Sequence, residues 1–264
     1  MTSFNAILDR AIHMAKLAGD TQLKLFRSKE LEIATKQNDF DVVTAADKES
    51  EKIIVTNIKK YYPDHSVLTE ESGFSLHGNG DWVWVIDPLD GTTNYSCGLP
   101  WFNVSIGIKH QGETVAGVVY APRLGELFTA TRGGGAALNG HPIKPSLTPV
   151  LSKAVVSTGF PYDKATNPDN NLDNVQRIMP IVRGLRRMGS AALDICYVAA
   201  GFLDAYWEMN LNEWDVCAAM LIAHEAGATA QRFRPDRNWS ILAANRHLAP
   251  QLLSIIGNKV GISQ

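Results

Sequence analysis

The feature that most constrains the fold is a short apolar run, Trp82-Val83-Trp84-Val85-Ile86, followed at once by Asp87-Pro88-Leu89-Asp90-Gly91-Thr92-Thr93-Asn94. Such a run predicts a buried strand. We expect this strand to end at Asp87 and to deliver Asp87 and Asp90 into a tight turn, where Pro88 presets φ and Gly91 permits close approach of backbone to a ligand. If the turn winds into a helix, both carboxylates face the same side and the amides of Gly91 and Thr92 favour phosphate. Alternatively, the acids only cap a local turn.

Hydrophobic spacing predicts the elements around this strand, and turn residues separate them. In the first part of the chain we expect two helices and an antiparallel meander, followed by a loop: helices at 4–18 and from 44 to Pro63, strands at 104–108, 115–120 and 126–131, loop at 133–140. After a passage at about 145–153, strands alternate with helices: strands at 154–158, 204–209 and 239–243, helices at 191–200, 214–226 and 248–256. The sequence therefore predicts a layered α/β fold with two lobes, 1–145 and 146–264.

Composition narrows the class of protein. The chain has 264 residues, 45% of them hydrophobic, with 25 Lys and Arg against 27 Asp and Glu. The hydrophobic fraction excludes global disorder. The near-equal numbers of basic and acidic residues argue against direct nucleic-acid binding as the main role. No apolar run approaches the roughly 18 residues of a membrane span, and residues 1–10 lack signal-peptide character. Three widely spaced cysteines favour a cytoplasmic location over a disulfide framework.

Other acidic residues lie at the edges of predicted elements. Asp47 lies at the start of the second predicted helix, Glu70 and Glu71 follow a short apolar run, and Asp215 lies in the first turn of a later helix. Taken singly, the helix dipole explains Asp215, and the two glutamates read as a solvated pair. Taken together, oxygen ligands at several element ends suit Mg²⁺. Two such ions sharing one carboxylate are suited to phosphoryl transfer.

Two further motifs have simpler interpretations. Gly133-Gly134-Gly135 lacks the Gly-Lys-Ser/Thr of a Walker loop, so we expect a turn and not a phosphate loop. The basic cluster of Arg183, Arg186 and Arg187 favours a solvated or subunit-interface patch over phosphate binding.

Several segments together resemble the inositol monophosphatase family, bacterial type, within the Mg²⁺-dependent, lithium-sensitive phosphatases. The segments are 41–47, 69–72, 84–94, 133–140, 186–194, 206–208 and 214–227. The resemblance implies an αβαβα sandwich of the inositol monophosphatase and fructose-1,6-bisphosphatase type, usually a homodimer, with two or three Mg²⁺ ions. Met220, Ala228, Ala121 and Thr69 depart from the family pattern, which bears more on substrate preference than on catalysis.

The resemblance also implies roles for single residues. One ion would be held by Glu70, Asp87 and the Leu89 carbonyl, a second by Asp87, Asp90 and Asp215, and a third would lie near Glu70. The catalytic residues would be Asp47 and Thr92, which orient the attacking water, together with Glu70. The residues in contact with the substrate would be Asp90, Gly91, Thr92, Gly189, Ala191, Glu208 and Asp215.

The function implied is hydrolysis of myo-inositol monophosphate by metal-activated water. A fructose-1,6-bisphosphatase or a broader sugar-phosphate phosphatase is the alternative within the enzyme class, and phosphatases of phosphonucleotides and histidinol phosphate are more distant. Some bacterial relatives also bind transcription machinery, so a regulatory interaction protein is the alternative of another class. The expected partners are a small phosphomonoester and a second copy of the chain, with no membrane and no direct nucleic acid contact.

Overall fold

The structure is a computed structural model that describes residues 4–28, 33–35, 42–78 and 80–256. Asp41, the first residue of one family segment, and the two ends of the predicted lobes, residues 1–3 and 257–264, lie outside the described residues. The described part contains no helix with the length and apolar character needed to cross a membrane.

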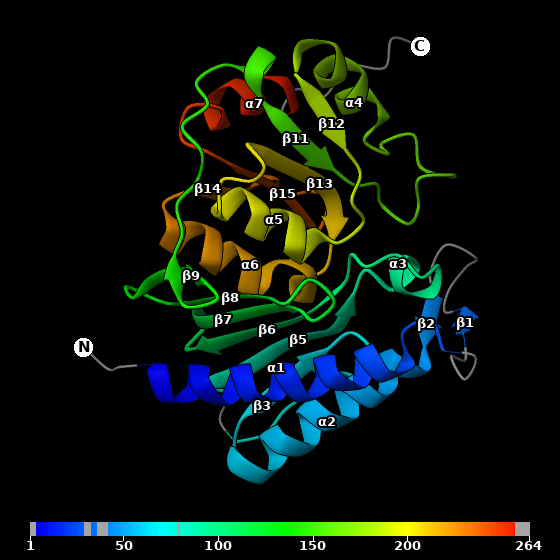
Figure 1. Cartoon of the computed structure of the whole chain (residues 1–264), viewed down its shortest axis with the longest axis vertical. Coiled ribbons are helices and arrows are strands. Elements are labelled where there is room, and N and C mark those ends of the chain that lie inside the picture. The colour runs from blue at the N-terminus through cyan, green and yellow to red at the C-terminus, as the bar shows by residue number, and fades with distance from the viewer. Residues whose placement is uncertain (1–3, 29–32, 36–41, 79, 257–264) are drawn as a thin grey trace.

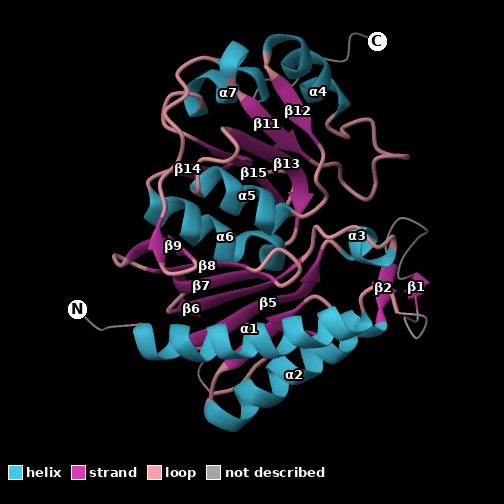
Figure 2. Ribbon diagram, viewed as in Figure 1, coloured by secondary structure: helices cyan, strands magenta, loops and turns pink. Residues whose placement is uncertain are grey.

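Five layers alternate between helices and sheets (Figure 1). The first layer holds α1 (Asn5–Leu25) and α2 (Ala45–Tyr61), the third α5 (Ala191–Ala199) and α6 (Glu213–Ala226), and the fifth α4 (Leu172–Ile178) and α7 (Ala249–Ile256). The sheets between them are distinct in Figure 2. This is the αβαβα sandwich that the family resemblance implied.

The larger sheet has eight strands in the order β10-β9-β8-β7-β6-β5-β3-β4. Its strands are β3 (Ser66–Thr69), β4 (Gly73–Ser75), β5 (Trp82–Asp90), β6 (Asn103–His110), β7 (Glu113–Ala121), β8 (Glu126–Thr131), β9 (Gly135–Leu138) and β10 (His141–Pro142). Strands β5 to β8 form the predicted antiparallel meander. Next to it, β3 runs parallel to β5, so Glu70, which follows β3, lies at the same edge as Asp87.

The smaller sheet has five strands in the order β12-β11-β13-β15-β14. Its strands are β11 (Val155–Thr158), β12 (Gly184–Arg186), β13 (Ala205–Leu211), β14 (Thr229–Arg234) and β15 (Trp239–Ala244). The remaining short elements are β1 (Ile33–Thr35), β2 (Val42–Thr44), α3 (Thr92–Ser96) and the 3₁₀ turns at Leu151–Lys153 and Met179–Ile181.

The hydrophobic pattern of each helix follows its layer. The outer helix α1 buries one face, with Ile7, Ala11 and Met14 among its core residues. By contrast, α5 lies between two sheets, and eight of its nine residues are buried. An all-round apolar helix is expected wherever both sides are covered. The core therefore continues through the middle helical layer and joins the two sheets.

Two local expectations were wrong. The strand from Trp82 does not end at Asp87 but continues to Asp90, because Asp90 still pairs with Asn103 of β6 after an irregularity in the register. No helix therefore forms between the two aspartates. The predicted loop at 133–140 contains β9, which pairs with β8.

Candidate active site

A pocket of about 420 Å³ opens where the ends of β5 and β13, the N-termini of α5 and α6 and the short helix α3 meet. Its lining includes the following predicted residues: Glu70, Asp87, Leu89, Asp90, Gly91, Thr92, Gly189, Ala191, Glu208 and Asp215. Asp47 is not part of the lining, but it is hydrogen-bonded to Thr92. Residues that are distant in sequence thus share one pocket.

The irregular end of β5 turns the backbone toward the pocket. Asp87 Oδ1 accepts a hydrogen bond of 3.0 Å from the Leu89 amide, which holds the turn across Pro88. Gly91 follows with φ at +93°, and an added Cβ would lie 2.8 Å from the Trp101 carbonyl oxygen. Both the backbone angle and the contact therefore require glycine, which caps α3.

Asp90 joins the eight-stranded sheet to the middle helical layer. Its Oδ2 accepts hydrogen bonds from Ser190 Oγ at 2.6 Å, the Ala192 amide at 2.9 Å and Asn103 Nδ2 at 3.0 Å. Ser190 is the N-cap of α5, since its hydroxyl also accepts from the Leu193 amide. One oxygen of this buried carboxylate is therefore committed to structure.

Thr92, which lines the pocket, is hydrogen-bonded to the buried Asp47. Thr92 Oγ1 lies 2.9 Å from Asp47 Oδ1 and also 2.9 Å from the Leu89 carbonyl oxygen. Asp47 Oδ2 accepts from the amide and hydroxyl of Thr44, the capping box that starts α2. Burial raises the pKa of Asp47 to about 6, although its hydrogen bonds with Thr44 and Thr92 oppose the rise.

Glu70 lies in the turn between β3 and β4, which α2 holds in place. The carboxylate of Glu51, on α2, accepts hydrogen bonds from Thr69 Oγ1 at 2.5 Å, the Glu71 amide at 3.1 Å and the Ser72 hydroxyl. Glu51 is only 6% exposed. The same helix therefore carries Asp47 and anchors the turn that carries Glu70.

Asp215 lies in the first turn of α6, as predicted, and also faces the pocket. Its Oδ2 accepts from the Asn212 amide at 2.7 Å, which completes the capping box of α6. Burial and the charge of Glu70 raise the pKa of Asp215 well above its usual range.

The pocket is strongly unfavourable for carboxylates that lack a counter-charge. Burial, followed by the charges of Glu70, Asp90 and Asp215, raises the pKa of Asp87 well above normal. Anionic oxygens under this mutual repulsion are the chemistry that a hard divalent cation stabilises. As they stand, however, no three or more His, Cys, Asp or Glu side chains in the described part of the chain form a group that could hold a metal ion. The ligand set therefore remains a prediction.

Glu208, on β13, lines the pocket from the smaller sheet. Tyr206 donates to Glu208 Oε2 at 2.6 Å, and a Cβ at Gly159 would overlap the carboxylate, so the side chain is closely enclosed. Burial raises its pKa to about 7, while the charges of Arg187 and Lys164 lower it.

Sequence reasoning missed several pocket residues. Arg187 is exposed, as expected of a solvated patch, but it also lines the pocket, as do Tyr162 and Lys164. The N-cap pattern of a serine before an apolar helix could have identified Ser190. The glycine turn at 133–135 is indeed a structural turn, because Glu225 accepts hydrogen bonds from the amides of Gly133 and Gly135.

Comparison with known proteins gives one consistent result. The model of the inositol monophosphatase family matches residues 5–260. A protein of Pasteurella multocida named Nus factor SuhB is 40% identical, with 97% of this chain and 96% of that protein covered. Among solved structures, an inositol monophosphatase from Anabaena (Nostoc) is 38% identical with a TM-score of 0.87, covering 97% of this chain and 96% of its own. The extragenic suppressor protein suhB from Bartonella henselae is 36% identical with a TM-score of 0.89, covering 97% of this chain and 100% of its own.

Proposed function

The chain belongs to the inositol monophosphatase family, and from that premise we propose that it is a Mg²⁺-dependent phosphomonoesterase that hydrolyses myo-inositol monophosphate to inositol and phosphate. The observation that carries the proposal is the meeting of Glu70, Asp87, Asp90 and Asp215 in one pocket with Thr92, which is hydrogen-bonded to Asp47. Carboxylates for a divalent cation and a hydroxyl–carboxylate pair for a water molecule are what metal-assisted hydrolysis needs.

Two or three Mg²⁺ ions would be held by the predicted ligands. The first would use Glu70, Asp87 and the Leu89 carbonyl, the second Asp87, Asp90 and Asp215, and a third would lie near Glu70. Bound there, Mg²⁺ offsets the charge of the phosphate dianion and lowers the pKa of water. The donor chemistry supports this assignment, since burial and mutual repulsion already raise the pKa values of Asp87 and Asp215.

The residues of the chain supply the orientation and the proton acceptor. Because the Thr92 hydroxyl has a single proton, donating it to Asp47 leaves the hydroxyl oxygen free to accept a hydrogen bond from the attacking water. Asp47, with a pKa of about 6, is ionised at neutral pH and takes the proton that the water releases. The water oxygen bonds to phosphorus as the ester P–O bond breaks, and the leaving inositol oxygen takes up a proton from solvent water.

Substrate contacts follow from the two ends of the pocket. The amides of Gly91 and Thr92 at the start of α3 would hold the phosphate. Glu208, Gly189 and Ala191, together with Asp90 and Asp215, would contact the polyol. A carboxylate such as Glu208 accepts hydrogen bonds from hydroxyl groups, which favours a polyol over an apolar alcohol.

The test is phosphate release from inositol 1-phosphate, fructose 1,6-bisphosphate and adenosine 3′,5′-bisphosphate, each with and without Mg²⁺. We expect Mg²⁺-dependent release, fastest from the inositol ester. Faster release from fructose 1,6-bisphosphate would transfer the assignment to the alternative within the enzyme class. No release from any ester by folded protein would refute the enzymatic proposal.

A second candidate function has one specific observation in its favour. The relative from Pasteurella multocida is named Nus factor SuhB. The alternative is therefore a regulatory protein that binds transcription machinery. Capture of RNA polymerase or its elongation factors by both the wild type and the Asp87→Asn variant would support it, because catalysis would then not be needed. Under either function, we expect the protein to lie in the cytoplasm, which the free cysteines Cys97, Cys196 and Cys217 favour. We also expect it to form a homodimer, as in the family.

A further inference from the structure

The segment between β11 and α4, residues 159–171, forms one wall of the pocket. Phe160, Pro161, Tyr162 and Lys164 line the pocket from it, and the segment lies on the same side of the molecule as α3 (Figure 1). Within residues 160–170, all of which the structure describes, Pro161 is the one buried side chain. Apolar packing therefore contributes little to its position, and polar contacts must supply the rest.

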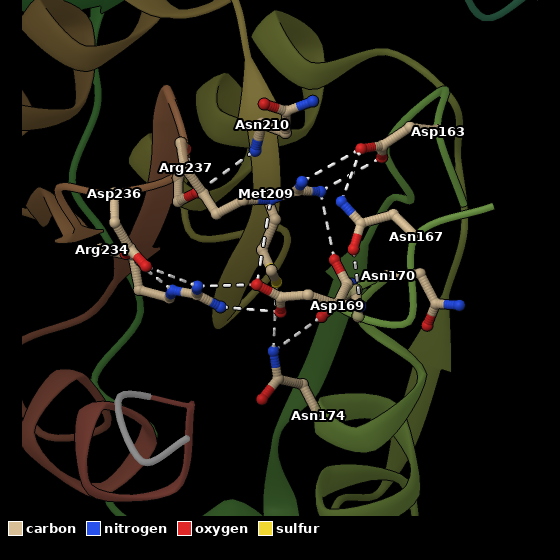
Figure 3. A network of polar contacts seen from close by, with 12 residues as sticks. Asp163, Asn167, Asp169, Asn170, Asn174, Met209, Asn210, Arg234, Asp236 and Arg237 are labelled. Atoms are coloured by element: carbon tan, nitrogen blue, oxygen red, sulfur yellow. Dashed lines mark hydrogen bonds and ion pairs between the residues drawn. The ribbon is translucent and has the colours of Figure 1, made fainter. Parts of the chain in front are cut away.

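Two arginines of the β14–β15 turn supply those contacts (Figure 3). Arg237 binds Asp163 with both terminal nitrogens, at 3.0 and 3.1 Å, and donates to the Asp169 carbonyl oxygen at 3.1 Å. Arg234 donates to Asp169 Oδ1 at 2.8 Å and is braced on its other side by Asp236. The wall is thus attached to the turn at two points, Asp163 and Asp169.

These ion pairs are more protected than ordinary surface pairs. The side chains of Arg234 and Arg237 are 10% and 14% exposed. Hydrogen bonding to Arg237 lowers the pKa of Asp163, and hydrogen bonding to Asp169 and Asp236 raises that of Arg234. The acidic partners Asp169 and Asp163 are 41% and 37% exposed, so it is the two-pronged hydrogen bonding of each guanidinium that makes these contacts stronger than a typical surface pair.

The same turn also contacts the strand that carries Glu208. Ser240 Oγ donates to the Arg237 carbonyl oxygen at 2.5 Å and accepts from the Asn210 amide at 3.2 Å. Asn210 lines the pocket two residues after Glu208. The wall, the arginines and the Glu208 strand are therefore linked, and the wall also contacts Glu208 directly, because a Cβ at its first residue, Gly159, would overlap the Glu208 carboxylate.

We propose that Arg234 and Arg237 are positioning residues that determine substrate specificity: by fixing the 159–171 wall relative to Glu208, they favour phosphomonoesters with a large hydroxylated alcohol part over small ones. This inference rests on the proposed function and deepens it. Gly159, the first residue of the wall, lies against the Glu208 carboxylate, so the position of the wall affects the contacts that Glu208 would make with the alcohol part.

The test compares two esters in three variants. Arg237→Gln and Asp163→Asn each break the paired hydrogen bonds between Arg237 and Asp163, whereas Arg132→Gln is the control because its guanidinium pairs with the exposed Glu113 of the larger sheet. With Mg²⁺, we expect the two test variants to raise KM for inositol 1-phosphate about fivefold, with kcat changed by less than about twofold. Both constants for methyl phosphate, and all constants of the control, should stay within about twofold of the wild type.

Hydrogen exchange of the peptide 160–171 supplies a readout that is independent of activity. The amides of Thr166 and Asn167 donate to the Asp163 carbonyl oxygen, so they should exchange faster in the two test variants than in the control. Unchanged exchange, or equal KM changes for both esters, overturns the positioning role. A wild-type protein that hydrolyses neither ester overturns the proposed function and the specificity role together, and the exchange rates distinguish that failure from a failure of positioning.

Discussion

Glu51 offers the sharpest test of how the helical layer supports the pocket. Its carboxylate accepts from two hydroxyls and the Glu71 amide around the turn that carries Glu70. In Glu51→Ala, the hydroxyls of Thr69 and Ser72 can rotate toward other acceptors, but the amide cannot. A buried donor left unpaired costs about 1–3 kcal/mol, and a hydrogen bond to a charged group contributes about 1.5–3 kcal/mol. We therefore expect the alanine variant to lose about 3 kcal/mol of unfolding free energy.

Glu51→Gln separates the charge from the hydrogen bonds. A glutamine oxygen in the place of Oε2 can still accept from the Glu71 amide and the Thr69 hydroxyl, and the Ser72 hydroxyl can accept from the glutamine NH₂ group. This variant should lose about 1 kcal/mol, because only the charge assistance disappears. Both variants should need more Mg²⁺ for half-maximal activity, roughly tenfold more for alanine, since the turn that orients Glu70 is loosened.

Urea unfolding of the metal-free protein gives the stability differences, and a Mg²⁺ titration of activity gives the second quantity. Glu49→Ala, on the exposed side of the same helix, is the matched control and should change neither. The reasoning is refuted if glutamine costs as much as alanine. It is also refuted if the alanine variant is destabilised but requires no more Mg²⁺ than the wild type.

Three further predictions concern single groups. Asp87→Asn should remain folded and should lose nearly all Mg²⁺-dependent turnover. Its unfolding midpoint in the absence of metal should be higher than that of the wild type, because a carboxylate repelled by its neighbours becomes a neutral amide. A variant that retains most of its activity contradicts the ligand assignment. Thr92→Val keeps the shape but not the hydroxyl, so kcat should fall by about 100-fold in steady-state assays while the half-saturating Mg²⁺ concentration stays constant. Burial lowers the pKa of His65, whose Nδ1 accepts a hydrogen bond from Trp84 Nε1 at 3.0 Å. The stability that neutral His65 contributes is therefore present above the unfolded pKa of about 6.5 and is lost as the pH falls toward the folded pKa. Between pH 7.5 and pH 5, urea unfolding should show a smaller loss of stability for His65→Phe than for the wild type.

The parts of the fold that could be predicted are those whose sequence pattern depends on a single helix or on neighbouring strands. The predicted end of α6 at Gly227 is correct, since this residue has a left-handed backbone with φ at +92° and closes an apolar helix. The meander was equally clear from its turns. That Asp87, Glu70 and Asp215 share a pocket was implied only by the family resemblance, because no local pattern brings together residues so far apart in the chain.

What the sequence could not predict depends on partners that are distant in the chain. Whether β5 continues past Pro88 is decided by Asn103 on the neighbouring strand. Similarly, Arg237 and Asp163 are 74 residues apart, and each alone reads as a solvated charge. Arg187 was assigned to a surface patch because three arginines at close spacing usually face water, and only the fold places one of them at the pocket.

The structural role of Asp90 has a consequence for how this chain can vary during evolution. One oxygen of its carboxylate holds Ser190, Asn103 and the Ala192 amide, while the residue also lines the pocket. A substitution that alters the chemistry of the pocket at this position also removes two contacts between the sheet and α5 and one within the sheet. A lineage adapting to a new substrate is therefore expected to leave Asp90 unchanged and to vary at exposed positions of the lining, such as Tyr162, which lie outside the core.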